Sequence, residues 1–116
     1  MDVRTSIESR GDGTRILSVA GELDLHTSPR FQEQLQAAIE APFEWLLVDL
    51  SDCDYLDSTA IHVLLQAKRS LDGRADRLAL IVPSPQLRRI FELARLDEVL
   101  HIHHDRAAAL PQHSNA

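Results

Sequence analysis

Apolar and polar residues alternate in two short segments near the start of the chain. Residues 3–8 and 14–20 are rich in β-branched side chains and flank residues 11–13, Gly-Asp-Gly, which tolerate a tight turn. This arrangement predicts a β-hairpin. Two later segments, residues 45–50 and 77–82, are nearly continuous apolar runs, which are typical of central strands covered on both faces.

Between these strands, apolar residues recur at intervals of three and four, which is the spacing of an amphipathic helix. The predicted helices cover residues 29–40, residues 59–71 and a third segment from Leu87 to Ala94. Serine followed by proline stands before the first helix at Ser28-Pro29 and before the third at Ser84-Pro85. Serine is a favoured N-cap and proline fits the first helical position, so both serines are predicted to cap these helices.

The C-terminal part of the chain shows weaker patterns. Residues 98–102 fit a short edge strand, Asp105 can cap a last helix through Leu110, and residues 112–116 are expected to fray. The predicted order is β-β-α-β-α-β-α-β-α, in which helices alternate with buried strands. The expected fold is a single α/β domain over residues 1–111, with a mixed β-sheet of four to five strands packed with about four helices.

Composition narrows the possible functions. The chain has 116 residues, 12 basic and 18 acidic, so its net charge is −6, which argues against nucleic-acid binding and suits a partner with a basic surface. Its longest apolar runs are too short to span a membrane, and its start lacks the apolar block of a secretory signal. We therefore expect a cytoplasmic protein without membrane insertion. The single cysteine, Cys53, excludes an internal disulfide and is expected to be a small packed residue.

Two acidic segments are candidates for a functional surface. Residues 21–27 are expected to form a loop after the second strand, and residues 49–60 lead from the end of a central strand to the start of a helix. In an open α/β sheet, such strand-to-helix loops form the functional edge. Within the second segment, Ser58 follows Asp57 and has two interpretations. It is either the N-cap of the helix or a phosphorylation site at a helix N-terminus, where an added anion is well tolerated.

The chain resembles the STAS-domain anti-sigma factor antagonists of bacterial partner-switching systems, over nearly its whole length. The resemblance rests on three motifs in this order: Gly21-Glu22-Leu23-Asp24 followed by His26-Thr27, then Asp57-Ser58-Thr59 after an apolar strand, then Ser84-Pro85 ahead of Leu87, Arg89 and Phe91.

This resemblance implies a regulator that has no catalytic activity and needs no cofactor. In such families the unphosphorylated antagonist binds an anti-sigma factor that is also a serine kinase, and the sigma factor is released. The kinase then phosphorylates a serine of the antagonist, which ends binding, and a serine phosphatase reverses the modification. By position, the phosphorylated residue is Ser58. The implied partner surface contains Asp24, His26, Asp57, Ser58, Thr59, His62 and Gln66.

The chain departs from the family motif where Ala60 and His62 replace the usual glycines. Because glycine lets a partner's backbone approach closely, these residues predict a partner fitted to larger side chains. They also favour an alternative function, a STAS interaction module of a transporter-associated or scaffold complex that is never phosphorylated. The intact Asp57-Ser58 pair favours the antagonist.

The residues also allow two further kinds of site, a catalytic triad and a metal site. Asp24, His26 and Ser58 can be written as acid, base and nucleophile, but no glycine-flanked nucleophile turn surrounds Ser58, so we do not expect an enzyme. The histidines at positions 101, 103 and 104 suggest a metal site only weakly, because the third faces away from the other two along a strand. We expect surface histidines there and no bound metal.

Overall fold

One five-stranded sheet organises the chain, and the computed structural model describes residues 2–71, 73–74 and 77–109. The strands follow the order β1 (Val3–Ser9), β2 (Thr14–Leu23), β3 (Trp45–Leu56), β4 (Leu78–Ile81) and β5 (His101–His103). β1 pairs antiparallel with β2, whereas β2, β3, β4 and β5 are parallel neighbours. The predicted hairpin and the predicted mixed sheet are both confirmed.

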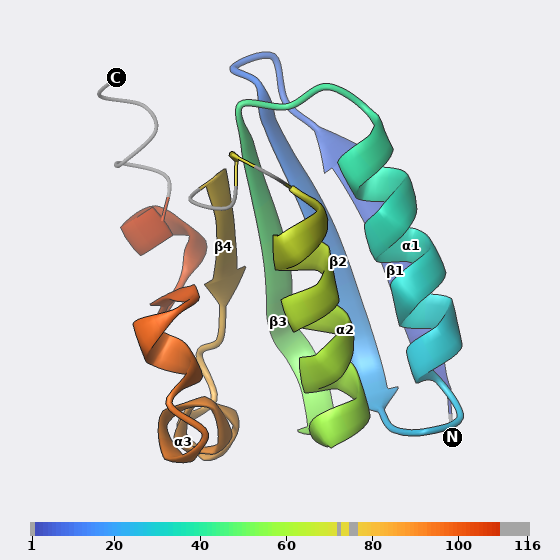
Figure 1. Ribbon diagram of the computed structural model, residues 1–116, viewed down its shortest axis with the longest axis vertical. Coiled ribbons are helices and arrows are strands. Elements are labelled where there is room, and N and C mark those ends of the chain that lie inside the picture. Colours follow the sequence, from blue (N-terminus) through green and yellow to red (C-terminus); the bar gives the residue numbers. More distant parts are fainter. Residues whose placement is uncertain (1, 72, 75–76, 110–116) are drawn as a thin grey trace.

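Helices connect the parallel strands. α1 (Ser28–Glu40) joins β2 to β3, α2 (Ser58–Ser70) joins β3 to β4, and both cover the same face of the sheet (Figure 1). α3 (Pro85–Leu93) and the 3₁₀ helix η2 (Leu96–Glu98) lead from β4 to β5, and residues 106–109 are helical. This confirms the α/β class. None of the helices described is long and apolar enough to cross a membrane.

The main core lies between the sheet and the helices. Phe31 and Leu35 of α1 and Leu64 of α2 are fully buried against strand residues such as Leu17 and Val48, as the helical periodicity predicts. A smaller apolar cluster also forms; its members are Ile16, Leu47, Ala79, Ile81 and Ala109. Through its last member, the C-terminal helical segment joins the packing of the sheet.

The two acidic segments extend their strands further than the sequence predicted. β2 continues to Leu23 and β3 to Leu56, where loops were expected, and these extensions pair with each other across two register irregularities. Gly21 lies opposite Cys53, and Leu23 opposite Leu56. Cys53 and Leu56 point into the core while their acidic neighbours stay exposed, so an acid-rich sequence remains a strand. The predicted packing of Cys53 is confirmed.

The region before β5 also corrects a prediction. The strand expected over residues 98–102 is instead η2 followed by β5 at His101–His103. A helical turn, closed by the Leu100 N–H donating to the Leu96 carbonyl at 2.7 Å, buries both leucines. Asp105 caps the last helical segment by accepting the N–H of Ala108 at 2.7 Å. The expected end of that helix and the fraying tail lie outside the described residues.

Candidate functional site

The β2–α1 turn and the β3–α2 junction meet at the carboxyl ends of two parallel strands. The Asp57 N–H donates to the Leu23 carbonyl at 3.1 Å, and the hydroxyl oxygens of Ser28 and Thr59 lie 2.8 Å apart. The structure therefore brings together the two acidic segments that the sequence singled out. We call this region the carboxyl edge.

Asp24 holds the β2–α1 turn together. Its Oδ1 accepts the main-chain N–H groups of His26 at 2.9 Å and Thr27 at 3.0 Å, while the Thr27 hydroxyl donates to the Glu22 carbonyl at 2.6 Å. The bond from the Thr27 N–H has the largest influence on the Asp24 carboxyl and lowers its pKa, and the His26 N–H acts in the same direction. The carboxylate thus stays ionised and fixes a turn on which the His26 side chain is exposed.

Ser28 is not the N-cap of α1, contrary to the prediction. The helix begins at Ser28 itself, and the capping position belongs to Thr27, which makes no side-chain capping bond. The cause is the preceding turn, in which the Ser28 N–H already donates to the Asp24 carbonyl at 2.9 Å. The buried Ser28 hydroxyl is therefore directed to Thr59. At the third helix, by contrast, Ser84 caps as predicted and accepts the Leu87 N–H at 3.3 Å.

The N-cap of α2 is Asp57, so the helix-cap interpretation of Ser58 is wrong. The Asp57 Oδ1 accepts both the N–H of Thr59, at 2.9 Å, and the Thr59 hydroxyl. Ser58 is the first helical residue, and its exposed hydroxyl makes no hydrogen bond with the residues described. The neighbouring hydroxyl of Thr59 is instead occupied between Asp57 and Ser28.

The outer face of α2 extends the carboxyl edge. Ser58, His62 and Gln66 follow one another at intervals of four and are all exposed, so they share one face of the helix. Thr59 is half-buried and turned toward α1. Ala60 is fully buried, so its methyl group belongs to the core. Of the two departures from the family motif, only His62 changes the exposed surface.

The sequence pattern did not point to two exposed apolar side chains at this edge. Leu25, in the β2–α1 turn, is 69% exposed, and Tyr55, near the end of β3, is 48% exposed. Tyr55 lies opposite Glu22 in the register of β2 and β3. The sequence offered a signal only for Leu25, an isolated apolar residue between Asp24 and His26, and such residues are common on protein surfaces.

The carboxyl edge does not assemble a catalytic triad of Asp24, His26 and Ser58. The hydrogen-bonded Asp24 oxygen is engaged with the main chain of its own turn, and no hydrogen bond among the described residues joins the His26 ring to Ser58. The Cys53 thiol is buried and donates to the Tyr55 carbonyl at 3.1 Å, and burial raises its pKa. Such a thiol is a poor nucleophile.

The histidines near β5 do not converge on one point. No group of three or more histidine, cysteine or acidic side chains in the described parts of the chain is placed to hold a metal ion. The Nδ1 atom of His104 lies 2.7 Å from Nη1 of Arg88, so this ring hydrogen-bonds to a guanidinium. Burial, followed by the neighbouring imidazoles, lowers the pKa of His103.

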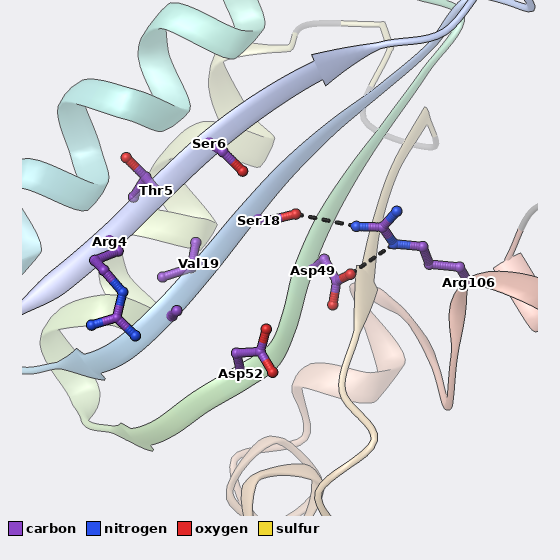
Figure 2. Close-up of a pocket in the computed structure, with 9 residues that line it drawn as sticks. Arg4, Thr5, Ser6, Ser18, Val19, Asp49, Asp52 and Arg106 are labelled. Atoms are coloured by element: carbon purple, nitrogen blue, oxygen red, sulfur yellow. Dashed lines mark hydrogen bonds and ion pairs between the residues drawn. The ribbon is translucent and has the colours of Figure 1, made fainter.

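A separate polar hollow of about 220 Å³ lies across β1, β2 and β3 (Figure 2). Ser6 of β1 and Ser18 of β2 pair with each other there, and their short side chains leave this space open. Arg106 borders it and donates from Nε to Asp49 at 2.8 Å and from Nη2 to Ser18 at 3.2 Å. Burial has the largest influence and would raise the pKa of Asp49, but hydrogen bonds from Ser51 and Arg106 outweigh it and lower that pKa. These contacts anchor the C-terminal helical segment to the sheet.

Known proteins share this fold and sequence pattern. Residues 7–109 match the family model of the STAS domain. The anti-sigma-B factor antagonist of Listeria monocytogenes is 32% identical over 102 residues, which cover 88% of this chain and 90% of that protein. The crystal structure of an anti-sigma factor antagonist from Mycobacterium paratuberculosis has a TM-score of 0.89 at 25% identity and covers 97% of this chain and 95% of its own. Unphosphorylated SpoIIAA of Bacillus shares the fold, with a TM-score of 0.70 at 19% identity over 97% of this chain and 99% of its own.

Proposed function

Because the chain belongs to the STAS domain family, and its relatives are named anti-sigma factor antagonists, we propose that it binds an anti-sigma factor with serine kinase activity. Phosphorylation of Ser58 by that kinase ends binding, and a serine phosphatase restores it. The observation that carries this proposal is the exposed Ser58 hydroxyl at the start of α2, which has no hydrogen-bond partner among the described residues. Since Asp57 supplies the helix cap, a phosphoryl group on Ser58 displaces no capping bond.

Electrostatics explains how such a phosphate acts as a switch. It adds about −1.5 to −2 charges at neutral pH. The N-terminus of α2 accommodates an anion, so the fold is retained. The carboxylates of Asp24 and Asp57 already lie at this edge, and the added charge increases repulsion of any acidic group on a docked partner. Burial of the phosphate under a partner adds a desolvation cost.

The proposed partner surface combines exposed polar groups with two apolar side chains. Leu25 and Tyr55 give it the apolar contacts that protein interfaces commonly bury at their centre. The other members are those proposed from the sequence: Asp24, His26, Asp57, Ser58, Thr59, His62 and Gln66. Thr59 contributes mainly by holding the two helix starts together, because its hydroxyl is already hydrogen-bonded.

The test measures binding to the anti-sigma factor that is recovered with the chain from its native cells. By calorimetry, Ser58→Ala retains binding but cannot be phosphorylated, whereas Ser58→Asp weakens binding about tenfold or more, because a charge is placed at the interface. Ser9→Asp, an exposed serine at the end of β1, is the matched control and binds like the wild type.

Phosphopeptide mapping after incubation with the recovered kinase gives phosphate on Ser58 and none on Thr59. Equal binding by Ser58→Ala and Ser58→Asp, or phosphate on Thr59 alone, contradicts the proposal. An unmodified chain recovered with a transporter or scaffold complex, under growth and stress conditions alike, supports the alternative function instead.

A further inference from the structure

We infer that His62 is the intramolecular binding partner of the phosphate on Ser58. The inference rests on the proposed function and concerns regulation at the same site. It assigns a specific role to the one departure from the family motif that lies on the exposed surface of α2. An imidazole at this position provides a hydrogen-bond donor that a glycine cannot provide.

The geometry of α2 places the two side chains together. Ser58 and His62 stand four residues apart in one continuous helix, so their Cβ atoms are about 5–6 Å apart on the same face. Side chains of a helix tilt toward its N-terminus, which directs the imidazole over the turn that begins at Ser58. Ala60, between them in sequence, is buried and leaves this face open.

The surroundings favour this pairing. The groove between α1 and α2 lies next to this pair, beginning at Val63 and Gln66 of α2, and α1 lines it with the neutral amides of Gln32 and Gln36. The nearby acids, Asp24 and Asp57, each have one oxygen bonded to main-chain N–H groups of their own turns. His26, exposed on the neighbouring turn, is the other imidazole of the carboxyl edge. Lys68 and Arg69 of α2 lie at the opposite end of the helix.

The consequence is a phosphate held against the helix. An imidazolium beside the phosphate stabilises the dianion and lowers the pH at which the phosphate loses its second proton, which is ordinarily about 6. The same pairing offsets part of the added charge, so His62 sets how much negative charge the partner meets.

The test is a ³¹P NMR titration of the full chain with phosphoserine incorporated at position 58 during translation. We expect the phosphate to titrate about 0.3 pH units lower in the wild type than in His62→Gln, the size expected for an exposed i,i+4 ion pair. His62→Arg restores the low midpoint, because arginine is permanently charged and binds phosphate well.

His101→Gln is the matched control and titrates like the wild type. His101 is exposed on β5 and pairs with Ala79 of β4, which pairs with Leu47 of β3. Leu47 lies nine residues before the end of β3, where α2 begins. His101 is therefore on the order of 30 Å from Ser58, measured along the strand. A midpoint in His62→Gln equal to that of the wild type overturns the inference and leaves the proposed function standing. Failure of the kinase to phosphorylate Ser58 counts against the proposed function and does not change the titration.

Discussion

Two neighbouring hydroxyls at the start of α2 differ in their availability for chemistry. Thr59 is hydrogen-bonded to Asp57 and Ser28, so modification of its oxygen would break the contact between two helix starts. Ser58 points outward and makes no hydrogen bond with the described residues. A kinase can therefore act on Ser58 while the hydrogen bonds beneath it stay intact. Two adjacent residues therefore differ in role: Ser58 is available for regulation, whereas Thr59 stabilises the structure.

Gly21 is a position where the fold requires the absence of a side chain. Its φ is +107°, and an added Cβ would lie 2.3 Å from the main-chain oxygen of Asp2, the residue just before the paired strand β1. We expect Gly21→Ala to lower the free energy of unfolding by about 2 kcal/mol or more, because both the backbone conformation and the close approach are lost. Urea denaturation of the wild type and the variant measures this loss of unfolding free energy.

Gly11→Ala is the control for that measurement. An added Cβ at Gly11 meets no atom within 4 Å, so we expect a change within about 0.5 kcal/mol. Similar losses for the two variants would show that the crowding at Gly21 does not determine its role.

The hydrogen bond between the Ser28 and Thr59 hydroxyls ties the first turn of α1 to the first turn of α2. Thr59→Val removes that contact and the hydroxyl bond to Asp57, but it keeps the main-chain N–H that Asp57 caps, so we expect a loss of about 1 kcal/mol or more. Ser28→Ala should cost a similar amount, and the double variant should lose less than the sum. Urea denaturation of all four proteins gives the coupling. Strict additivity would mean that the two hydroxyls do not stabilise each other.

Regular periodicity predicted the elements of this fold closely, because it reflects local burial. The helix expected over residues 29–40 is Ser28–Glu40, and the apolar run at residues 45–50 is the start of β3. The continuation of β3 to Leu56 could not be found in this way. Its acidic residues are typical of a loop. They form a strand because they pair with β2, which lies more than 30 residues earlier in the chain.

The carboxyl edge likewise combines features that the sequence predicted with features that it could not predict. The meeting of the two acidic segments followed from parallel topology, which places strand ends together. The helix caps did not follow, because aspartate, serine and threonine are all good caps and only turn geometry selects among Asp57, Ser58 and Thr59. The burial of Ala60 and the exposure of Leu25 likewise depend on packing between elements.

Across the whole molecule, Arg106 connects the C-terminal helical segment to the sheet. It donates hydrogen bonds to Asp49 of β3 and Ser18 of β2, which lie 57 and 88 residues away in sequence. Its Nη1 atom also lies 3.7 Å from Oε1 of Glu8 of β1. Asp49 is 7% exposed, so its charge depends on the bonds from Arg106 and Ser51. None of these residues belongs to the proposed partner surface, so the stability of the fold and partner binding can be altered separately.

The Asp49 contacts predict how stability depends on pH. The pKa of Asp49 in the folded chain is lowered from its ordinary value of 3.8, so the unfolded chain binds the proton more readily. The stabilisation is therefore present above pH 3.8 and is lost as the pH falls through the folded-state pKa. Asp49→Asn lacks this component and should be less stable than the wild type at pH 6, with the two curves converging as the pH falls through the folded-state pKa of Asp49. Urea denaturation of both proteins from pH 6 downward measures the difference in their free energies of unfolding. The lowered pKa of Asp24 contributes equally to both proteins and cancels from this difference. Parallel curves would show that Asp49 is not stabilised in its charged form.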